Sequence, residues 1–158
     1  MCAMLFEQRL RVPAGLVIAG GGSLLLGALG FEHLGGMAPC EMCMWQRWAL
    51  VAAVAVAAIG WALGSRAMVA LSGVAVLAGA GIAGFHAGVE QKWWEGITTC
   101  AATPMGGSTQ DVIGAILAAP LVRCDAIPWS LFGLSMAGWN MVISTLIGGL
   151  ALWQLKRA

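Results

Sequence analysis

Charged side chains are scarce in this sequence. Lys, Arg, Asp and Glu make up only 9% of the 158 residues and hydrophobic residues 60%, whereas a soluble domain carries roughly 25% charged residues. The mean hydropathy of +0.87 agrees with this, and together these values exclude an ordinary soluble domain and indicate a membrane protein. The chain also has no basic stripe, and its net charge of +1 argues against an electrostatic nucleic-acid binder.

The first apolar run lacks the A-x-A cleavage site that ends a signal peptide. Residues 12–31 carry no charge and are long enough to cross a ~30 Å hydrocarbon core, longer than the ~7–15-residue apolar region of a typical signal peptide. We therefore expect a retained membrane helix. The chain also shows no internal repeat and no low-complexity linker, so we expect a single integral membrane domain over residues 1–158.

The remaining apolar runs predict three further spans. The four expected spans cover residues 12–31, 44–63, 67–89 and 129–152, and the loops on the side of the cysteine pairs cover residues 32–43 and 90–128. Within the second of these loops, Ser108-x-x-Asp111 reads as a capping box before an apolar stripe at residues 112–117. The fold class expected is thus an all-α, four-transmembrane-helix bundle with a short interfacial helix in its second outer loop.

The basic residues predict the orientation of this bundle. One side of the four-span arrangement holds most of them: Arg9, Arg11, Arg66, Lys156 and Arg157. The other side holds only Lys92 and Arg123, so the positive-inside rule places both termini in the cytoplasm and the cysteine loops outside. Four of the five cysteines then face an oxidising compartment, where cysteines can cycle as disulfides, and Cys2 stays alone on the reducing side.

One cysteine pair opens the second span. If the helix runs from about Cys40, the spacing of Cys40 and Cys43 puts both sulfurs on one face, and Arg47 falls one turn below Cys43. A helix N-terminus and a nearby cation both stabilise a thiolate. A relay of thiol–disulfide exchange needs a second pair within reach, and Cys100 and Cys124 supply it in the other outer loop.

The order of these motifs resembles a known family. The run Pro39-Cys-x-x-Cys-x-x-Gln-Arg47, the loop pair that follows it, and a last helix entered through Gly133-Leu134-x-Met136 resemble the DsbB family of the bacterial inner membrane. The resemblance implies an enzyme, a quinone-dependent protein-dithiol oxidoreductase that reoxidises a periplasmic thioredoxin-like, DsbA-type partner. Its cofactor would be ubiquinone or menaquinone, and its cysteine loops would be periplasmic.

The resemblance also implies a role for each of the four cysteines. The partner would attack Cys100 in the disulfide with Cys124, forming a mixed disulfide with Cys100. Cys124 would then exchange with the inner pair, with Cys40 as its disulfide partner. Cys43 would face the quinone and reduce it.

Three further residues are implied to lie at the quinone. Arg47 would hold a quinone oxygen and favour the Cys43 thiolate, and His86 matches a family histidine close to the quinone. Gln46 stands where some members carry a glutamate, so the part played by a carboxylate in proton handling stays open. Arg47 could instead be an interfacial anchor, and His86 a hydrogen-bonded structural residue.

Other functions remain open at this point. Four cysteines can bind zinc, but Cys100 and Cys124 lack the close spacing of a zinc motif, and we predict no metal. A vitamin K epoxide reductase-like enzyme also has two cysteine pairs in a helical bundle, although its loop pair precedes the C-x-x-C motif. A structural or metal-binding tetraspan protein is the alternative that is not an enzyme.

Overall fold

Four long helices make up most of the described chain. The computed structural model describes residues 2–97 and 122–157, with side chains from Leu10 onward. The helices are α1 Cys2–His33, α2 Glu41–Ala62, α3 Arg66–Glu90 and α5 Met136–Arg157. Each contains a stretch long and apolar enough to cross a membrane, which confirms the predicted all-α, four-helix membrane fold. The interfacial helix predicted at residues 112–117 lies outside the described residues.

Side-chain caps decide where α2 and α3 begin. Cys40 is the N-cap of α2, where its sulfur accepts the backbone N–H of Cys43, and the acidic Glu41 in the first turn suits the positive end of the helix dipole. The helix therefore begins at Glu41, next to the expected start at about Cys40, and includes Cys43, which precedes the span expected from residue 44. Ser65 caps α3 in the same way, accepting the N–H of Met68, directly after a turn at Gly64 with a positive φ of 63°.

The last helix begins later than expected. Residues 129–135 were expected to be helical, but Ser130–Leu131 (β1) and Leu134–Ser135 (β2) form a small antiparallel hairpin before α5 starts at Met136. Phe132 and Gly133 at its turn have φ angles of 53° and 77°, which a right-handed helix cannot contain. The indole of Trp139 in α5 donates to the carbonyl of Leu131 at 3.1 Å and so fastens the hairpin to the helix.

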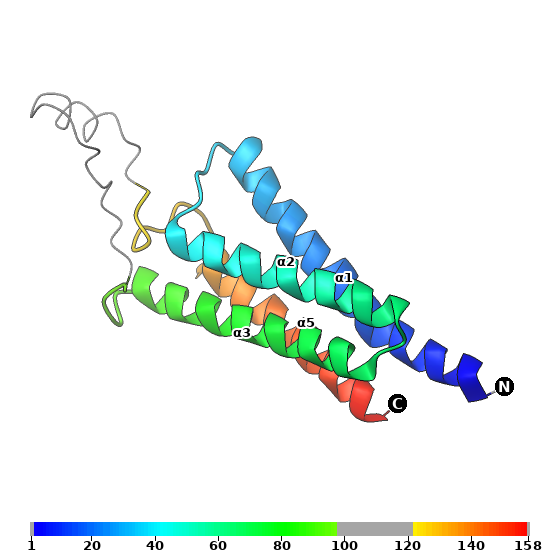
Figure 1. Cartoon of the computed structure of the whole chain (residues 1–158). Helices are drawn as coiled ribbons and strands as arrows, with labels where there is room; N and C mark the ends of the chain where they lie inside the picture. The colour runs from blue at the N-terminus through cyan, green and yellow to red at the C-terminus, as the bar shows by residue number, and fades with distance from the viewer. Residues whose placement is uncertain (1, 98–121, 158) are drawn as a thin grey trace, which may run out of the picture.

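Glycines allow the helices to approach closely. α3 lies along both α2 and α5, and α1 packs mainly on α2 and α5 (Figure 1). A Cβ atom on Gly148 of α5 would lie 3.0 Å from the backbone oxygen of Gly73 in α3. A Cβ atom on Gly60 of α2 would lie 3.0 Å from the backbone nitrogen of Val69 in α3. Small residues at these crossings let van der Waals packing hold the membrane helices together.

The two ends of the bundle differ in what they contain. Both termini and the turn between α2 and α3 lie at one end, and the start of α2 and the hairpin lie at the other (Figure 1). The core of the first end is an apolar cluster of Leu10, Ala14, Val69 and Leu155. The core of the second end contains Cys40, Met42, Val89 and Cys124. The sequence-predicted site residues that are described all lie toward this second end, called here the cysteine end.

Candidate functional site

Cys40 and Cys43 bring their sulfur atoms together at the start of α2. The two Sγ atoms lie 2.9 Å apart, with the Cys40 thiol donating to Cys43, and the Cys43 N–H donates to the Cys40 sulfur at 3.3 Å. The hydrogen bond to Cys43 raises the pKa of Cys40, and burial raises it further. The pair therefore keeps its proton on Cys40 and favours negative charge on Cys43.

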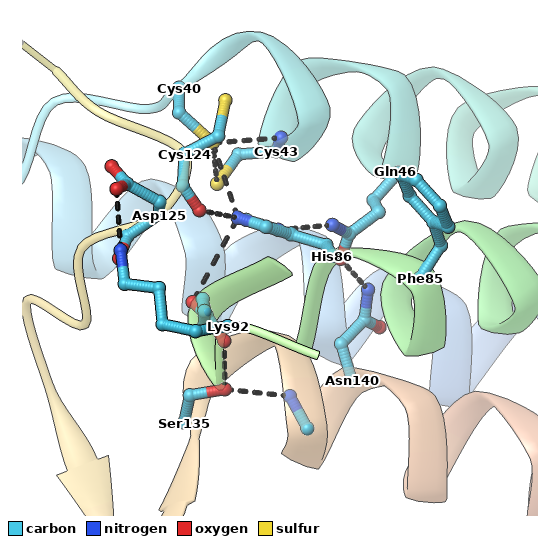
Figure 2. Close-up of polar contacts among 12 residues, drawn as sticks. Cys40, Cys43, Gln46, Phe85, His86, Lys92, Cys124, Asp125, Ser135 and Asn140 are labelled. Atoms are coloured by element: carbon cyan, nitrogen blue, oxygen red, sulfur yellow. Dashed lines mark hydrogen bonds and ion pairs between the residues drawn. The ribbon is translucent and has the colours of Figure 1, made fainter. Parts of the chain in front are cut away.

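Cys124 packs against this pair although it is distant in the sequence. Its side chain is only 2% exposed and belongs to the same cluster as Cys40, with Cys43 packed against that cluster (Figure 2). Cys100, its predicted partner in the outer loop, lies outside the described residues. One residue of the predicted outer pair thus packs against the inner pair.

Asp125 fastens the Cys124 segment to the end of α3. Its carboxylate accepts a hydrogen bond from Lys92 at 2.5 Å and two from Arg123 at 2.8 Å, and Lys92 also donates to the backbone oxygen of Asp125 at 2.9 Å. The Arg123 and Lys92 hydrogen bonds lower the pKa of Asp125. The two cations that the sequence placed on the outer side therefore meet on one carboxylate beside Cys124.

His86 of α3 connects the inner pair with the Cys124 segment. Its Nε2 atom lies 3.6 Å from the Cys40 sulfur and 3.1 Å from the backbone oxygen of Cys124. Its Nδ1 atom lies 2.9 Å from the amide nitrogen of Gln46 in α2. The ring is 3% exposed, and Figure 2 shows it between the cysteines on one side and Gln46 on the other.

Two amide side chains continue this contact into α5. Asn140 donates its amide N–H to the Gln46 oxygen at 2.6 Å, and the Ser144 hydroxyl donates to the Asn140 oxygen at 3.0 Å. Sequence reasoning missed Asn140. The available signal was an amide inside an otherwise apolar span, since polar residues within membrane helices mark functional sites.

Glu90 is a second residue that sequence reasoning missed. It ends α3 with a carboxylate that is 3% exposed and accepts a hydrogen bond from the Ser135 hydroxyl, which in turn accepts the N–H of Gly138 at 3.1 Å. One carboxylate oxygen lies 3.8 Å from Nε2 of His86. A buried acid next to a buried histidine was signalled by the i,i+4 spacing of the two residues.

The described bonds of Arg47 run to α1 and not to the Cys43 sulfur. Its guanidinium turns toward α1, where it pairs with the carboxylate of Glu32 and donates to the backbone oxygen of Ala28 at 3.0 Å. A nearby carboxylate is a stronger partner for a poorly solvated guanidinium than a thiol. Arg47 still lines the same cavity as Cys43, so the two residues face a common space.

This space is a cavity of about 450 Å³ at the cysteine end. Its wall is mostly apolar, and its polar and reactive lining groups are few: Ser23, Cys40, Cys43, Gln46, Arg47, His86, Glu90, Arg123 and Asn140. A volume of this size and an apolar wall with few polar groups suit a small apolar ligand. A quinone ring has this character, because it is flat and apolar and carries two oxygens that accept hydrogen bonds.

The cysteine end also contains donor atoms that a metal could use. Sγ of Cys40, Sγ of Cys43 and a ring nitrogen of His86 lie within 4.8 Å of one another, and zinc binds such groups. Zinc would need the lone pair of Nε2, but that atom faces the carbonyl of Cys124, which can only accept a hydrogen bond. The absence of a metal at this site therefore stays our prediction.

Comparisons with known proteins agree on one family. The family described as "Disulfide bond formation protein DsbB" matches residues 10–154. A protein of Acinetobacter baumannii named "Disulfide bond formation protein B" is 29% identical, over 93% of this chain and 91% of its own length. Proteins of the same name from Aromatoleum aromaticum and Verminephrobacter eiseniae are 30% and 32% identical, over 83% and 85% of this chain and 86% and 80% of their own lengths. No solved structure matched.

Proposed function

Because the chain belongs to the DsbB family of disulfide bond formation proteins, we propose that it is a membrane thiol:quinone oxidoreductase. In this proposal it reoxidises a periplasmic thioredoxin-like, DsbA-type protein and passes the electrons through two cysteine pairs to ubiquinone or menaquinone. The observation that carries the proposal is the meeting of Cys40, Cys43 and Cys124 beside an apolar cavity. Thiol–disulfide exchange requires direct contact between sulfurs, and a lipid-soluble acceptor requires its donor within the bilayer.

The outer half of the relay begins with the partner. Its thiolate attacks Cys100 in the Cys100–Cys124 disulfide, so that a mixed disulfide forms and the electron pair leaves on Cys124. The Cys124 thiolate then attacks Cys40 in the Cys40–Cys43 disulfide, which forms a Cys40–Cys124 bond and releases Cys43 as a thiolate. Burial of Cys124 against Cys40 supports this choice of sulfur.

The inner half restores both disulfides. The second thiol of the partner resolves its mixed disulfide and releases Cys100, which attacks Cys124 and leaves Cys40 as a thiolate. The Cys40 and Cys43 thiolates then close their own disulfide and give up two electrons. A bound quinone would accept these two electrons, together with the two protons that the thiols of the partner have released, and would leave as the quinol.

In this proposal the residues that line the cavity donate the electrons, bind the acceptor and exclude water. Cys43 is the sulfur on which the pair favours negative charge, which suits it as the electron donor. The Arg47 guanidinium has five N–H groups, and its bonds to Glu32 and Ala28 leave others to hold an oxygen of the acceptor. The apolar walls exclude water from the sulfurs.

The placement of charge supports an orientation. Arg66, Lys156 and Arg157 belong to the end with the termini, opposite the cysteine end. We therefore place both termini in the cytoplasm of a bacterium and the cysteine end at the periplasmic face of its inner membrane. The oxidising compartment is the one in which a disulfide relay operates.

Oxidation of a purified DsbA-type dithiol protein tests this function. The detergent-solubilised chain should oxidise it only when a soluble ubiquinone analogue is added, with one quinone consumed for each disulfide formed. Cys43→Ser should reduce the rate to background, because the donor sulfur is lost. A matched control is Cys2→Ser, which removes the cysteine outside the relay and should leave the rate unchanged.

The same preparations can reject the proposal. Quinone-dependent oxidation that survives Cys43→Ser would remove Cys43 from the electron path. Turnover of a vitamin K epoxide without oxidation of the dithiol protein would favour the vitamin K epoxide reductase-like alternative. Permanently oxidised, inert cysteines would favour a structural protein.

A further inference from the structure

The backbone carbonyl of Cys124 determines where His86 carries its proton. A carbonyl oxygen can only accept a hydrogen bond, so Nε2 of His86, 3.1 Å away, must be the donor. In a neutral imidazole the other nitrogen, Nδ1, then has a lone pair and needs a donor. Gln46 provides one, since its amide nitrogen lies 2.9 Å from Nδ1.

With His86 neutral and its lone pair on Nδ1, the rest of the hydrogen-bond chain runs in one direction. With its N–H toward His86, Gln46 turns its oxygen to Asn140, and Asn140 donates to that oxygen at 2.6 Å. The oxygen of Asn140 then faces the Ser144 hydroxyl, which donates to it at 3.0 Å. Each member is satisfied, and no buried side-chain nitrogen or oxygen lacks a partner within the described residues.

We propose that Gln46, held by Asn140, is a positioning residue that keeps His86 neutral with its proton on Nε2. The ring then offers a single N–H, which Cys124 and Cys40 share: the Cys124 carbonyl at 3.1 Å and the Cys40 sulfur at 3.6 Å. An imidazolium would need an acceptor at Nδ1, and Gln46 presents a donor there. The amide therefore sets the charge of the ring as well as its orientation.

The groups around His86 fit this assignment. The titratable neighbours of the ring are Cys40 and Cys43 from the start of α2 and Glu90 from its own helix. The Glu90 carboxylate, at 3.8 Å from Nε2, is too far for a hydrogen bond and accepts one from Ser135 instead. From α5 the described contact comes through Asn140, which is neutral and adds no charge.

The single N–H has a use in the relay, and this step rests on the proposed function. When Cys100 attacks Cys124, the Cys40–Cys124 bond breaks and the electron pair leaves on the Cys40 sulfur. A donor already directed at Cys40 stabilises that leaving thiolate. Because the same N–H binds the Cys124 backbone, departure of the Cys124 segment releases it entirely to Cys40.

Histidine ¹⁵N spectra of the quinone-free protein test the inference without turnover. The chain has two histidines, and His33→Gln leaves His86 as the only one. We expect a neutral His86 protonated on Nε2 at pH 7. Gln46→Glu should convert it to the doubly protonated ring, because a carboxylate accepts from Nδ1. Thr145→Ala, which removes an exposed hydroxyl of α5 beside Ser144, should change nothing.

A redox titration gives the second readout. In a Cys2→Ser, Cys100→Ser, Cys124→Ser background Cys40 and Cys43 are the only cysteines left to titrate against glutathione. Gln46→Glu should shift this equilibrium about tenfold toward the reduced pair, or about 30 mV, because a charged ring stabilises a thiolate better than a neutral one. Gln46→Leu would leave Asn140 without its acceptor, so Gln46→Glu, which keeps every hydrogen bond, is the more informative variant.

Three results would overturn the proposal. They are a doubly protonated or Nδ1-protonated His86 in the wild type, a neutral ring in Gln46→Glu, and a Nε2 signal that shows bound zinc after the protein is prepared with zinc. Each can occur while the protein still oxidises its dithiol partner, so failure of this inference is separate from failure of the proposed function.

Discussion

The two ends of the bundle are built from the same four helices but bury different kinds of side chain. The end with the termini is closed by apolar side chains such as Leu10 and Leu155, and the guanidinium of Arg66 donates to the carbonyl of Leu155. The cysteine end buries Gln46, His86 and Glu90 instead. A buried polar group is costly unless it is hydrogen-bonded, and these three are. The difference indicates that the first end serves stability and the cysteine end serves chemistry.

The largest effect should come from removing a sulfur of the cysteine end. Cys124→Ser should reduce dithiol oxidation to background, since Cys40 loses its exchange partner. When the partner is added in its disulfide form, the free Cys100 thiol should attack it and form a mixed disulfide, which Cys124 can no longer resolve. Non-reducing electrophoresis would detect it. Thermal unfolding should stay close to that of the wild type, because serine is nearly isosteric with cysteine. If no adduct forms with the partner in excess, the assignment of Cys100 as the attacked sulfur is wrong.

The opposite end should respond in stability and not in chemistry. Leu10→Ala should lower the free energy of unfolding by about 2 kcal/mol, because it removes packing atoms from a side chain that is 2% exposed. The rate per folded molecule should not change. Val12→Ala, at a position that is 56% exposed, is the matched control and should cost much less. Denaturation in mixed detergent micelles measures both, and a loss of rate per folded molecule in Leu10→Ala would break the division between the ends.

Each end of the bundle has an arginine that bonds to a backbone carbonyl, so the same Arg→Ala substitution can be compared at the two ends. Arg47→Ala at the cysteine cavity should raise the KM for the quinone analogue about tenfold, the loss of one hydrogen bond from a charged donor. Arg66→Ala at the other end should leave that KM unchanged, although it also removes a bond to a backbone carbonyl. Steady-state kinetics at saturating dithiol partner give both values. Equal KM values for wild type and Arg47→Ala would assign Arg47 to the ion pair with Glu32 alone.

The smallest effect should come from the ion pairs of Asp125 that hold the Cys124 segment in place. Asp125→Asn should increase the rate of maleimide labelling at Cys124 a few-fold, since exposed ion pairs are individually weak. Peptide mass spectrometry isolates this cysteine, and Glu95→Gln, at an exposed acid, is the control.

The pH dependence of this effect has a definite sign. The pKa of Asp125 is lowered from its usual 3.8, so the fastening is fully present above that value and is lost only as the pH falls through the lowered pKa. The ratio of the labelling rates of Asp125→Asn and wild type should therefore be the same at pH 5 and pH 8. A ratio that falls toward one at pH 5 would mean that another group holds the segment.

Much of the fold could be predicted because the bilayer allows few solutions. An uncharged run of sufficient length must be a helix in hydrocarbon, so the composition predicted four spans and the structure confirms them. The predicted start of the last helix was wrong, because Phe132 and Gly133 form a turn whose dihedral angles no hydropathy pattern reveals. The family was also readable, from the order of its motifs, and the comparisons confirm it.

The candidate site was readable only in part. Local spacing predicted that Cys40 and Cys43 share a helix face, because they lie in one helical turn. The same kind of argument did not reveal the ion pair of Arg47, whose long side chain reaches a carboxylate on another helix. Asn140 was missed because its significance depends on a contact with Gln46 on another helix. Glu90 was missed because its significance depends on a contact with His86, one turn earlier in the same helix.

The sequence by itself determined the membrane class, the four helices and the family, because these depend on composition, length and the order of short motifs. Only the tertiary structure decided that the Cys124 carbonyl, His86, Gln46 and Asn140 form one directional hydrogen-bond chain. The physical reason is that a hydrogen bond acts over about 3 Å, so its partners are fixed by how the helices pack and not by their separation along the chain.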